Sequence, residues 1–349
     1  MNTVIRRFPM RLDVRRGTVD MTHGSGGHAT AQLIEALFVR HLDNEILRQA
    51  NDQAAFDVSA GRMVMSTDSH VVSPLFFPGG DIGALAVHGT INDVAMSGAH
   101  PRYLSAAFIL EEGFPLADLE RIVASMAQAA SKAGVPVVTG DTKVVERGKG
   151  DGVFITTTAV GVVPDGVKIS GNRAQPGDVI LVSGTVGDHG VAIMSSRENL
   201  AFETCIESDS AALHELVAAM VAAAPDIHCL RDPTRGGLAT TLNELAQQSG
   251  VGMLLQEDAI PVRSEVAAAC ELLGLDVLYV ANEGKLVCIC APGDALCLLQ
   301  VMRAHPLGRQ AAIIGEVVAD VQGFVQMETA FGGRRIVDWL VGEQLPRIC

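Results

Sequence analysis

Apolar residues recur at helical spacing in some stretches and gather with β-branched residues in others, and these two patterns predict an alternation of helices and strands. Over residues 115–133, Leu119, Ile122 and Met126 fall on one face at helical spacing. Over residues 153–163, valine and threonine dominate, as is typical of strands. Further helices are predicted over 33–38, 82–97, 211–224, 238–248, 264–273 and 294–305. Further strands are predicted over 63–70, 103–110, 135–138, 179–183, 251–256, 277–281, 285–291 and 311–318.

A break in this alternation divides the chain into two parts. Pro164 and Pro176 bracket a stretch of turn-forming residues, which predicts a domain boundary near residue 166. A length of 349 residues also fits two domains. We therefore expect mixed helix-and-strand domains over 22–165 and 166–331, a basic leader arm over 1–21 and a mobile tail over 332–349.

Composition and charge narrow the classes of function. The net charge of −14 disfavours nucleic acid or an anionic membrane as the main partner, since both need a basic surface. No apolar run approaches the roughly 18 residues of a membrane-spanning helix, and the arginine-rich leader lacks the apolar stretch of a signal peptide. Seven cysteines without a C-x-x-C pair indicate a reduced compartment, which we expect to be the cytoplasm.

Three of the cysteines raise the question of a metal site. Cys288 and Cys290 are separated by one residue, and Cys297 follows shortly after. The first two, however, lie in a continuous apolar run from Leu286 to Cys290. This setting favours thiols buried in a strand over metal ligands.

Two glycine-containing stretches are candidates for phosphate or nucleotide contacts. The first leads into a predicted helix, where backbone N–H groups and the helix dipole suit an anion. It consists of His23, Gly24, Ser25, Gly26 and Gly27. The same glycines could instead form a flexible hinge. The second follows the predicted strand 135–138 and is read either as a nucleotide contact or as a turn with a solvated lysine. It contains Gly140, Asp141, Thr142 and Lys143. Neither is a P-loop, because no Gly-Lys-[Ser/Thr] follows.

Four acidic residues are candidates for chemistry. Asp52, Asp68 and Asp93 sit at the ends of three different predicted elements, as in sites that collect oxygen ligands for Mg²⁺. Each of them could equally be a cap or turn residue. Glu283 lies on a predicted tight turn between apolar strands. It is either a partly desolvated general base or a turn acid paired with Lys285.

The chain ends on a cysteine. Cys349 follows Gly333 by 16 positions, so its thiol could reach roughly 50 Å from a hinge at Gly332 and Gly333. Such a reach suits a group that is loaded at one site and processed at another. The alternative is an incidental terminal thiol in a reduced cytosol.

Taken together, these motifs resemble those of the hydrogenase maturation family HypE, the carbamoyl dehydratases. That family belongs to the PurM-like ATP-binding superfamily of aminoimidazole ribonucleotide synthetase, selenophosphate synthetase and thiamine-monophosphate kinase. The matching stretches cover nearly the whole chain beyond residue 20. They are 23–27, 66–69, 76–80, 92–95, 140–145, 183–190, 234–237, 281–285 and 346–349. The terminal Pro346-Arg347-Ile348-Cys349 is the stretch specific to HypE.

The resemblance implies a fold, a reaction and partners. It implies a two-domain PurM-like α+β architecture whose N-terminal domain binds ATP and pairs with its copy in a homodimer. A carbamoyltransferase, HypF, would load a carbamoyl group onto the terminal cysteine, and ATP would drive its dehydration to a thiocyanate. The cyano group would then pass to iron of the [NiFe]-hydrogenase site through a HypC–HypD complex.

The resemblance also assigns roles to residues of this sequence. Cys349 would carry the substrate, with Glu283 as base and Lys143 assisting proton transfer or stabilising the phosphoryl group. Asp52, Asp68 and Asp93 would hold Mg²⁺, and Pro346 and Arg347 would serve tail recognition. The ATP-binding set is His23, Gly24, Ser25, Gly26, Gly27, Asn92, Gly140, Asp141 and Thr142. One departure is Gln53 after Asp52, where superfamily members often show two adjacent acids.

Two other functions stay open from sequence. One is a sister synthetase or kinase acting on a free small molecule, which would have no use for a terminal thiol. The other is a scaffold without enzymatic activity whose thiol only passes a group onward. An enzyme that acts on a free small molecule should keep its full turnover when Cys349 is removed. A scaffold without enzymatic activity should consume no ATP even when it is carbamoylated.

Overall fold

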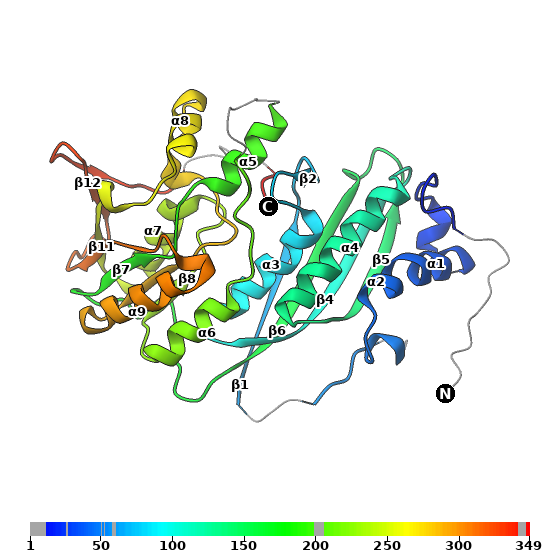
Figure 1. The fold of residues 1–349 in the computed structure, drawn as a ribbon, viewed down its shortest axis with the longest axis horizontal. Coiled ribbons are helices and arrows are strands. Elements are labelled where there is room, and N and C mark those ends of the chain that lie inside the picture. Colours follow the sequence, from blue (N-terminus) through cyan, green and yellow to red (C-terminus); the bar gives the residue numbers. More distant parts are fainter. Residues whose placement is uncertain are drawn as a thin grey trace.

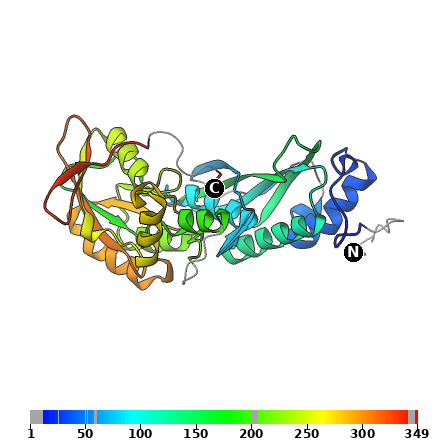
Figure 2. The ribbon, with the colours of Figure 1, turned by 90° about the horizontal axis from the view of Figure 1, so that it is seen from above.

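The structure, a computed structural model, describes residues 12–25, 27–49, 51, 53–57, 61–198, 206–340 and 347–349. Two sheets with helices packed on them lie side by side in an elongated molecule (Figure 1). The C-terminus lies between the two parts in both views (Figure 2). None of the described helices is long and apolar enough to cross a membrane.

The N-terminal part is built on a four-stranded sheet in the order β1–β6–β4–β5, in which β4 and β5 are parallel and the other neighbours antiparallel. Its elements are α1 (His28–Leu33), α2 (Arg40–Leu42), β1 (Arg62–His70), β2 (Phe76–Phe77), β3 (Gly80–Asp81), α3 (Ile82–Ala95), β4 (His100–Glu111), α4 (Leu116–Ala133), β5 (Val137–Val145) and β6 (Val153–Val163).

One face of this sheet is buried and the other is open. β6 alternates buried and partly exposed residues along its whole length, as expected for a strand with one covered face. Helices α3 and α4 cover the buried face, and Leu119, Ile122 and Met126 of α4 are fully buried, as the sequence pattern predicts. On the open face, Met65 is 72% and Ile109 42% exposed.

The C-terminal part contains a seven-stranded sheet in the order β13–β12–β9–β11–β7–β10–β8. Its elements are β7 (Val179–Val182), α5 (Asp188–Arg197), α6 (His214–Ala223), β8 (Cys229–Arg231), α7 (Gly237–Ser249), β9 (Gly252–Gln256), α8 (Ser264–Leu273), β10 (Val287–Cys290), α9 (Pro292–Ala304), β11 (Ala312–Val318), β12 (Val325–Glu328) and β13 (Arg334–Ile336).

The central strands of this sheet are buried on both faces. Cys288 and Cys290 of β10 share a core with α6 and α9, whereas Val287 and Ile289 face a second core formed with α7. This arrangement explains why β10 reads as a continuous apolar run. The prediction that Cys288 and Cys290 are buried strand thiols is confirmed.

The two parts share a core. Buried residues of α3 belong to the same apolar cluster as Leu216 of α6 and Leu298 of α9. The junction is therefore a packed interface, and polar residues placed there are shielded from water.

Two segments differ from the sequence prediction in their secondary structure. Residues 139–143, predicted as a loop, continue β5, because they pair in parallel with 105–109 of β4. Residues 277–281, predicted as a strand, begin with a 3-10 turn over Val277–Tyr279, because the side chain of Asp276 accepts a hydrogen bond from the N–H of Leu278. The short strands β8, β12 and β13 had no sequence prediction.

The glycine pair at 332 and 333 closes a hairpin. The N–H of Gly332 donates to the carbonyl of Thr329, the N–H of Thr329 donates to the carbonyl of Gly333, and Gly332 has φ +81°. Strand β13 follows and pairs with β12. The predicted hinge is therefore a hairpin turn whose φ favours glycine.

Candidate active site

Carboxylates from four elements meet at the junction of the two parts. Asp68 lies near the end of β1, Asp93 near the end of α3, Asp232 just after β8, and Glu283 in the loop before β10. Ser66 of β1 donates a hydrogen bond of 2.7 Å to Asp93. Neighbouring carboxylates contribute to the raised pKa of Asp93, Asp232 and Glu283, and Asp68 is among the contributors to each, so the four share one electrostatic environment. We call Asp68, Asp93, Asp232 and Glu283 the carboxylate cluster.

Burial dominates the electrostatics of this cluster. It raises the pKa of Glu283 well above its usual range, and the nearby Asp232, Asp209, Asp68 and Asp93 raise it further. It also raises the pKa of Asp232 to about 7, with Asp93 adding to the effect. Glu283 is 3% exposed, and its Oε1 has no hydrogen-bond partner. A buried carboxyl whose pKa is raised in this way is suited to general acid–base chemistry.

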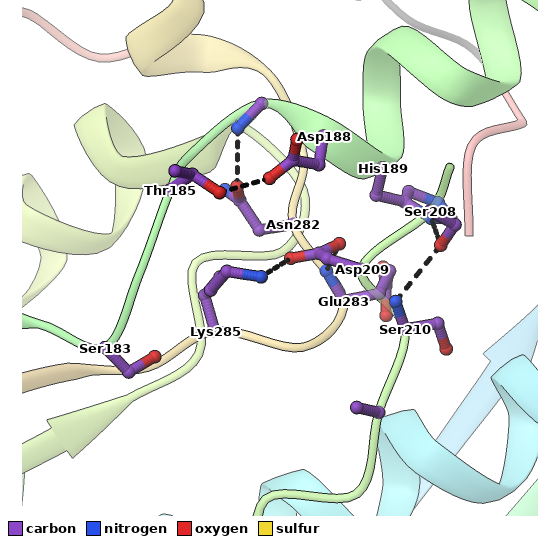
Figure 3. A network of polar contacts seen from close by, with 12 residues as sticks. Ser183, Thr185, Asp188, His189, Ser208, Asp209, Ser210, Asn282, Glu283 and Lys285 are labelled. Atoms are coloured by element: carbon purple, nitrogen blue, oxygen red, sulfur yellow. Dashed lines mark hydrogen bonds and ion pairs between the residues drawn. The ribbon is translucent and has the colours of Figure 1, made fainter. Parts of the chain in front are cut away.

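The loop that carries Glu283 is held by Asp209 (Figure 3). Oδ1 of Asp209 accepts from the N–H of Glu283 at 3.0 Å, and Oδ2 accepts from Nζ of Lys285 at 2.8 Å. A Cβ on Gly284 would lie 1.8 Å from the carbonyl oxygen of Asp209, so only glycine fits there. Lys285 thus pairs with Asp209, and the alternative in which it neutralises Glu283 is wrong.

The terminal thiol lies inside this site. Burial raises the pKa of Cys349 well above its usual range, and Glu283, which is within hydrogen-bond reach of the thiol, raises it further. The guanidinium of Arg235 acts in the opposite direction. Cys349 and Glu283, predicted from distant parts of the sequence, are therefore brought together.

Backbone pairing and packing fix the chain end in this position. The N–H of Val71 donates to the backbone carboxylate oxygen of Cys349, and the N–H of Ser73 donates to the carbonyl of Arg347, each at 3.1 Å. Ile348 is 3% exposed and belongs to the core shared by the two parts. The last residues thus lie as a short antiparallel segment beside the chain that follows β1.

A second group of predicted residues lines a cavity of about 220 Å³ at β5. Gly24 faces Gly140, Asp141, Thr142 and Lys143 there, and the apolar wall includes Ile34 and Phe38. A Cβ on Gly24 would lie 2.8 Å from the backbone nitrogen of Val144, so the glycine-rich turn packs directly on the strand. The cavity combines an apolar wall with backbone and charged groups, as nucleotide sites do.

Three other members of the glycine-rich stretch have different positions. His23 is buried, and its Nδ1 accepts from the N–H of Asp20 at 3.0 Å, which makes it a capping residue of the turn. Ser25 donates to the carbonyl of Thr22, and Gly27 precedes α1. Gly26 lies outside the described residues.

Lys143 is not brought to Glu283 within one chain. It lies on β5, at the opposite edge of the sheet from β1, three strand spacings or roughly 14 Å away. It is on the open face, with its side chain 64% exposed, and it pairs with Asp141 at 2.9 Å. Asp68 points to the covered face, because it pairs with the buried Thr157.

Asn92 supports the loop that holds Glu283. Its Nδ2 donates to the carbonyls of Ala211 and Glu283, at 3.0 and 3.2 Å, and its Oδ1 accepts from the N–H of Leu213 at 2.8 Å. The amide group is 1% exposed and its bonds go to the backbone. It contributes to the geometry of the site through these contacts.

The cation site is only partly formed by the described residues. Asp68 and Asp93 lie together in the carboxylate cluster, whereas Asp52 lies outside the described residues. In the described part of the chain, no three carboxylate, imidazole or thiol groups are arranged to hold a metal ion by themselves. The crowded carboxylates and the unpartnered Oε1 of Glu283 nevertheless fit a cation that takes further ligands from a phosphate.

Sequence reasoning missed three residues of the site. Asp209 follows a stretch without periodic pattern, and Asp232 precedes a proline that suggests only a turn. His189 lies in the matching stretch 183–190, but the sequence predicts no role for it. Their partners come from distant segments, so no local pattern could assign them.

Comparison with known proteins agrees with this architecture. The profile of the AIR synthase related protein N-terminal domain matches residues 50–163, and that of the C-terminal domain matches residues 175–328. A thiamine-monophosphate kinase from Stenotrophomonas maltophilia, 21% identical, shares the fold with a TM-score of 0.62.

Closer similarity is found to proteins of one kind. Carbamoyl dehydratase HypE of Azotobacter vinelandii is 73% identical over 339 residues, which is 97% of this chain and 99% of the relative. The crystal structure of the hydrogenase maturation protein HypE in complex with ATP is 55% identical, with a TM-score of 0.91, covering 94% of this chain and 99% of the other. A HypE–HypF complex is 49% identical, with a TM-score of 0.78, covering 88% and 99%.

Proposed function

The chain belongs to the HypE family of carbamoyl dehydratases, and from this premise we propose that it uses ATP to dehydrate a carbamoyl group carried on its own Cys349 to a thiocyanate. The observation that supports the proposal most strongly is the position of the terminal thiol. Cys349 lies beside Glu283, the most strongly desolvated member of the carboxylate cluster. A free small substrate would have to compete with the chain's own tail for this place.

The reaction balances with ATP as the second substrate. The carbonyl oxygen of the S–C(=O)–NH₂ group attacks the γ-phosphorus, and ADP leaves. Loss of phosphate and of both N–H protons then yields S–C≡N. Oxygen thus leaves as phosphate, which is a far better leaving group than hydroxide.

Glu283 is the group that removes protons from the nitrogen. Its carboxyl is close to the thiol of Cys349, and its raised pKa makes it a stronger base than an exposed glutamate. Asp68 and Asp93, together with Asp52, are the proposed ligands of Mg²⁺, which would offset charge on the phosphates.

The nucleotide is proposed to bind in the cavity at β5, and this requires a second copy of the chain. Lys143, Asp141 and the cavity lie on the opposite edge of the sheet from Glu283. The open face of this sheet exposes Met63, Met65 and Ile109, which pairing of two such faces would cover. In such a homodimer, Lys143 of one copy can approach the carboxylate cluster of the other.

Two further partners follow from the chemistry. A carbamoyltransferase, for which HypF is the candidate because a HypE–HypF complex is among the similar structures, would load Cys349. A HypC–HypD complex would take the cyano group to iron. Both exchanges would require the chain end to leave the site, since Cys349 is partly buried there and its backbone is bonded to Val71.

Intact-mass measurement tests the proposal. Loading should add about 43 Da to the protein, and ATP should then remove about 18 Da. Cys349→Ala should abolish loading, whereas Cys297→Ala, at an exposed cysteine of α9, should leave both steps unchanged. Glu283→Gln should load and then stay undehydrated.

Other outcomes would contradict it. Loading at Cys297 would move the carrier role away from the chain end. ATP hydrolysis by loaded protein with no loss of mass would exclude the dehydration, and a normal yield of the dehydrated form in Glu283→Gln would exclude Glu283 as the base.

A further inference from the structure

The last three residues are held by side chains that do not touch the reacting group. His189 lies in the first turn of α5 and Arg197 at its last residue, and Asp151 comes from the loop between β5 and β6. They contact the backbone of Arg347 and Ile348 and the side chain of Arg347. The proposed chemistry of thiol, base and phosphate does not require any of them.

His189 is fixed in one tautomer by its two partners. Its Nε2 lies 2.7 Å from the carbonyl oxygen of Ile348, which can only accept, so Nε2 carries the proton and donates. Its Nδ1 therefore accepts from the hydroxyl of Ser208, also at 2.7 Å. Figure 3 shows His189 and Ser208 facing one another at the end of the network that contains Asp209 and Glu283.

The ring of His189 is also fixed by packing. It is fully buried and meets the ring of Phe77 edge to face, with centroids 5.6 Å apart. Ser208 is held in turn, because its N–H donates to the carbonyl of Pro78 and its hydroxyl accepts from the N–H of Ser210. The imidazole is thus placed before the chain end arrives.

Arg197 and Asp151 hold the residue before Ile348. The guanidinium of Arg197 donates to the carbonyl of Ser73 at 2.7 Å and to that of Arg347 at 3.0 Å, so it joins the tail to the segment beside it. Asp151 forms an ion pair with the side chain of Arg347. Arg347 has φ +53°, a conformation that is uncommon outside glycine and that these contacts must maintain.

We propose that His189, Arg197 and Asp151 form a tail clamp that positions loaded Cys349 against Glu283 and sets how often the chain end leaves the site. The inference rests on the proposed function. Because the clamp reads two backbone carbonyls and the charge of Arg347, it holds the chain end whatever group the sulfur carries. The three are positioning residues, and their loss should release the tail without removing the catalytic carboxylate.

The first test measures release of the tail directly. Alkylation of Cys349 by iodoacetamide, followed by peptide mass mapping, reports the fraction of time that the thiol is outside, and exposed Cys297 is the internal standard. Asp151→Asn removes a half-exposed ion pair and should accelerate alkylation of Cys349 about threefold. Asp226→Asn removes a comparable surface pair with Arg173 in the other part of the molecule and should change nothing.

The second test separates positioning from folding. His189→Leu removes the donor to Ile348 and should accelerate alkylation at least about tenfold and slow dehydration of loaded protein by a similar factor. His189→Gln can place an amide N–H near the same carbonyl and should restore most of both. A thermal unfolding midpoint close to that of the native protein, measured on each variant, confirms that the fold is intact.

The outcomes keep the clamp distinct from the proposed function. If native loaded protein is not dehydrated, the proposed function fails, while the alkylation rates still test the clamp. If native protein is dehydrated and Asp151→Asn and His189→Leu, both folded, match its alkylation and dehydration rates, the clamp is overturned. Failure of His189→Gln to improve on His189→Leu would also overturn the hydrogen-bond role of His189.

Discussion

At the scale of single residues, burial determines the chemistry of Glu283 and Cys349. It raises the pKa of both, because a negative charge on either would be poorly solvated and would face the neighbouring carboxylates. The thiol inside the site is consequently protonated and a poor nucleophile. In the proposed reaction, loading would therefore take place with the chain end outside, and the partly buried position would serve the dehydration step.

Burial also gives a histidine away from the reacting groups a measurable effect on stability. Burial, together with Lys132 and His214, lowers the pKa of His88 to about 4. In the unfolded chain it is near 6.5, so the unfolded state binds more protons between these values. Stability should therefore fall as pH drops from about 6.5 to 4, by up to about 3 kcal/mol from this residue.

The variant His88→Gln isolates this contribution. Its free energy of unfolding, measured by urea denaturation, should depend less on pH between 6.5 and 4 than that of the native protein. At pH 7 and above, the difference between their free energies of unfolding should not depend on pH, and it should reflect the lost bond to Ser210. Parallel curves for the two proteins over the acid range would show that His88 is protonated in the folded state.

At the scale of elements, the segment around Asp209 organises the base. Asp209 bonds to the loop of Glu283 on one side and to Lys285 on the other, and both side chains of the ion pair are nearly buried. Burial acts to raise the pKa of Asp209, but the charge and hydrogen bond of Lys285 and the hydrogen bond from the N–H of Glu283 outweigh it, so the net shift is downward and the carboxylate stays charged. This charge in turn contributes to the raised pKa of Glu283.

Removal of one member of that pair should be costly. Asp209→Asn leaves the ammonium group of Lys285 buried without its counter-charge and should lower the free energy of unfolding by about 3 kcal/mol. The double variant Asp209→Asn with Lys285→Met should recover most of the loss, because no unpaired charge remains. Urea denaturation of the two variants measures this, and equal destabilisation of both would contradict a charge-based role.

The elements show how far the sequence could lead. Helices with a clear apolar face, such as α4, were predicted from their periodicity, and strands rich in valine and threonine, such as β6, from their composition. Residues 139–143 were read as a loop because Gly140 and Asp141 disfavour strands, yet pairing with β4 overrides that preference. Local propensity contains no information about a neighbouring strand from elsewhere in the chain.

The same reason limits prediction of the site. Cys349, Glu283, Asp68 and Asp93 were identified by residue type and setting, and the structure brings them together. Asp209 and His189 act through bonds to residues 74 and 159 positions away in the sequence. Such contacts exist only in the folded molecule, so these residues carry no local signal.

At the scale of the whole molecule, the proposed nucleotide cavity and the proposed catalytic base lie apart within one chain. The cavity with Lys143 lies at one edge of the four-stranded sheet, and Glu283 lies beyond the other. The exposed methionines on the open face of that sheet supply an apolar surface for a second copy. We predict that each working site combines Lys143 of one copy with Glu283 of the other.

Mixed dimers test this arrangement. In a purified dimer of one Lys143→Ala chain and one Glu283→Gln chain, one site should keep both residues, and activity should be about half of native. Each variant paired with itself should be inactive. The mirror construction, both substitutions in one chain beside a native chain, should be inactive if sites are shared and about half active if each chain forms its own site.

The most direct test of the central claim follows the oxygen atom. Protein loaded on Cys349 with an ¹⁸O-labelled carbamoyl group is mixed with ATP for one turnover, and the released phosphate is analysed by mass. The label should appear in phosphate in step with the loss of one labelled water, about 20 Da, from the protein. Unlabelled phosphate released while the protein keeps its labelled carbamoyl group would contradict ATP-driven dehydration at the chain end.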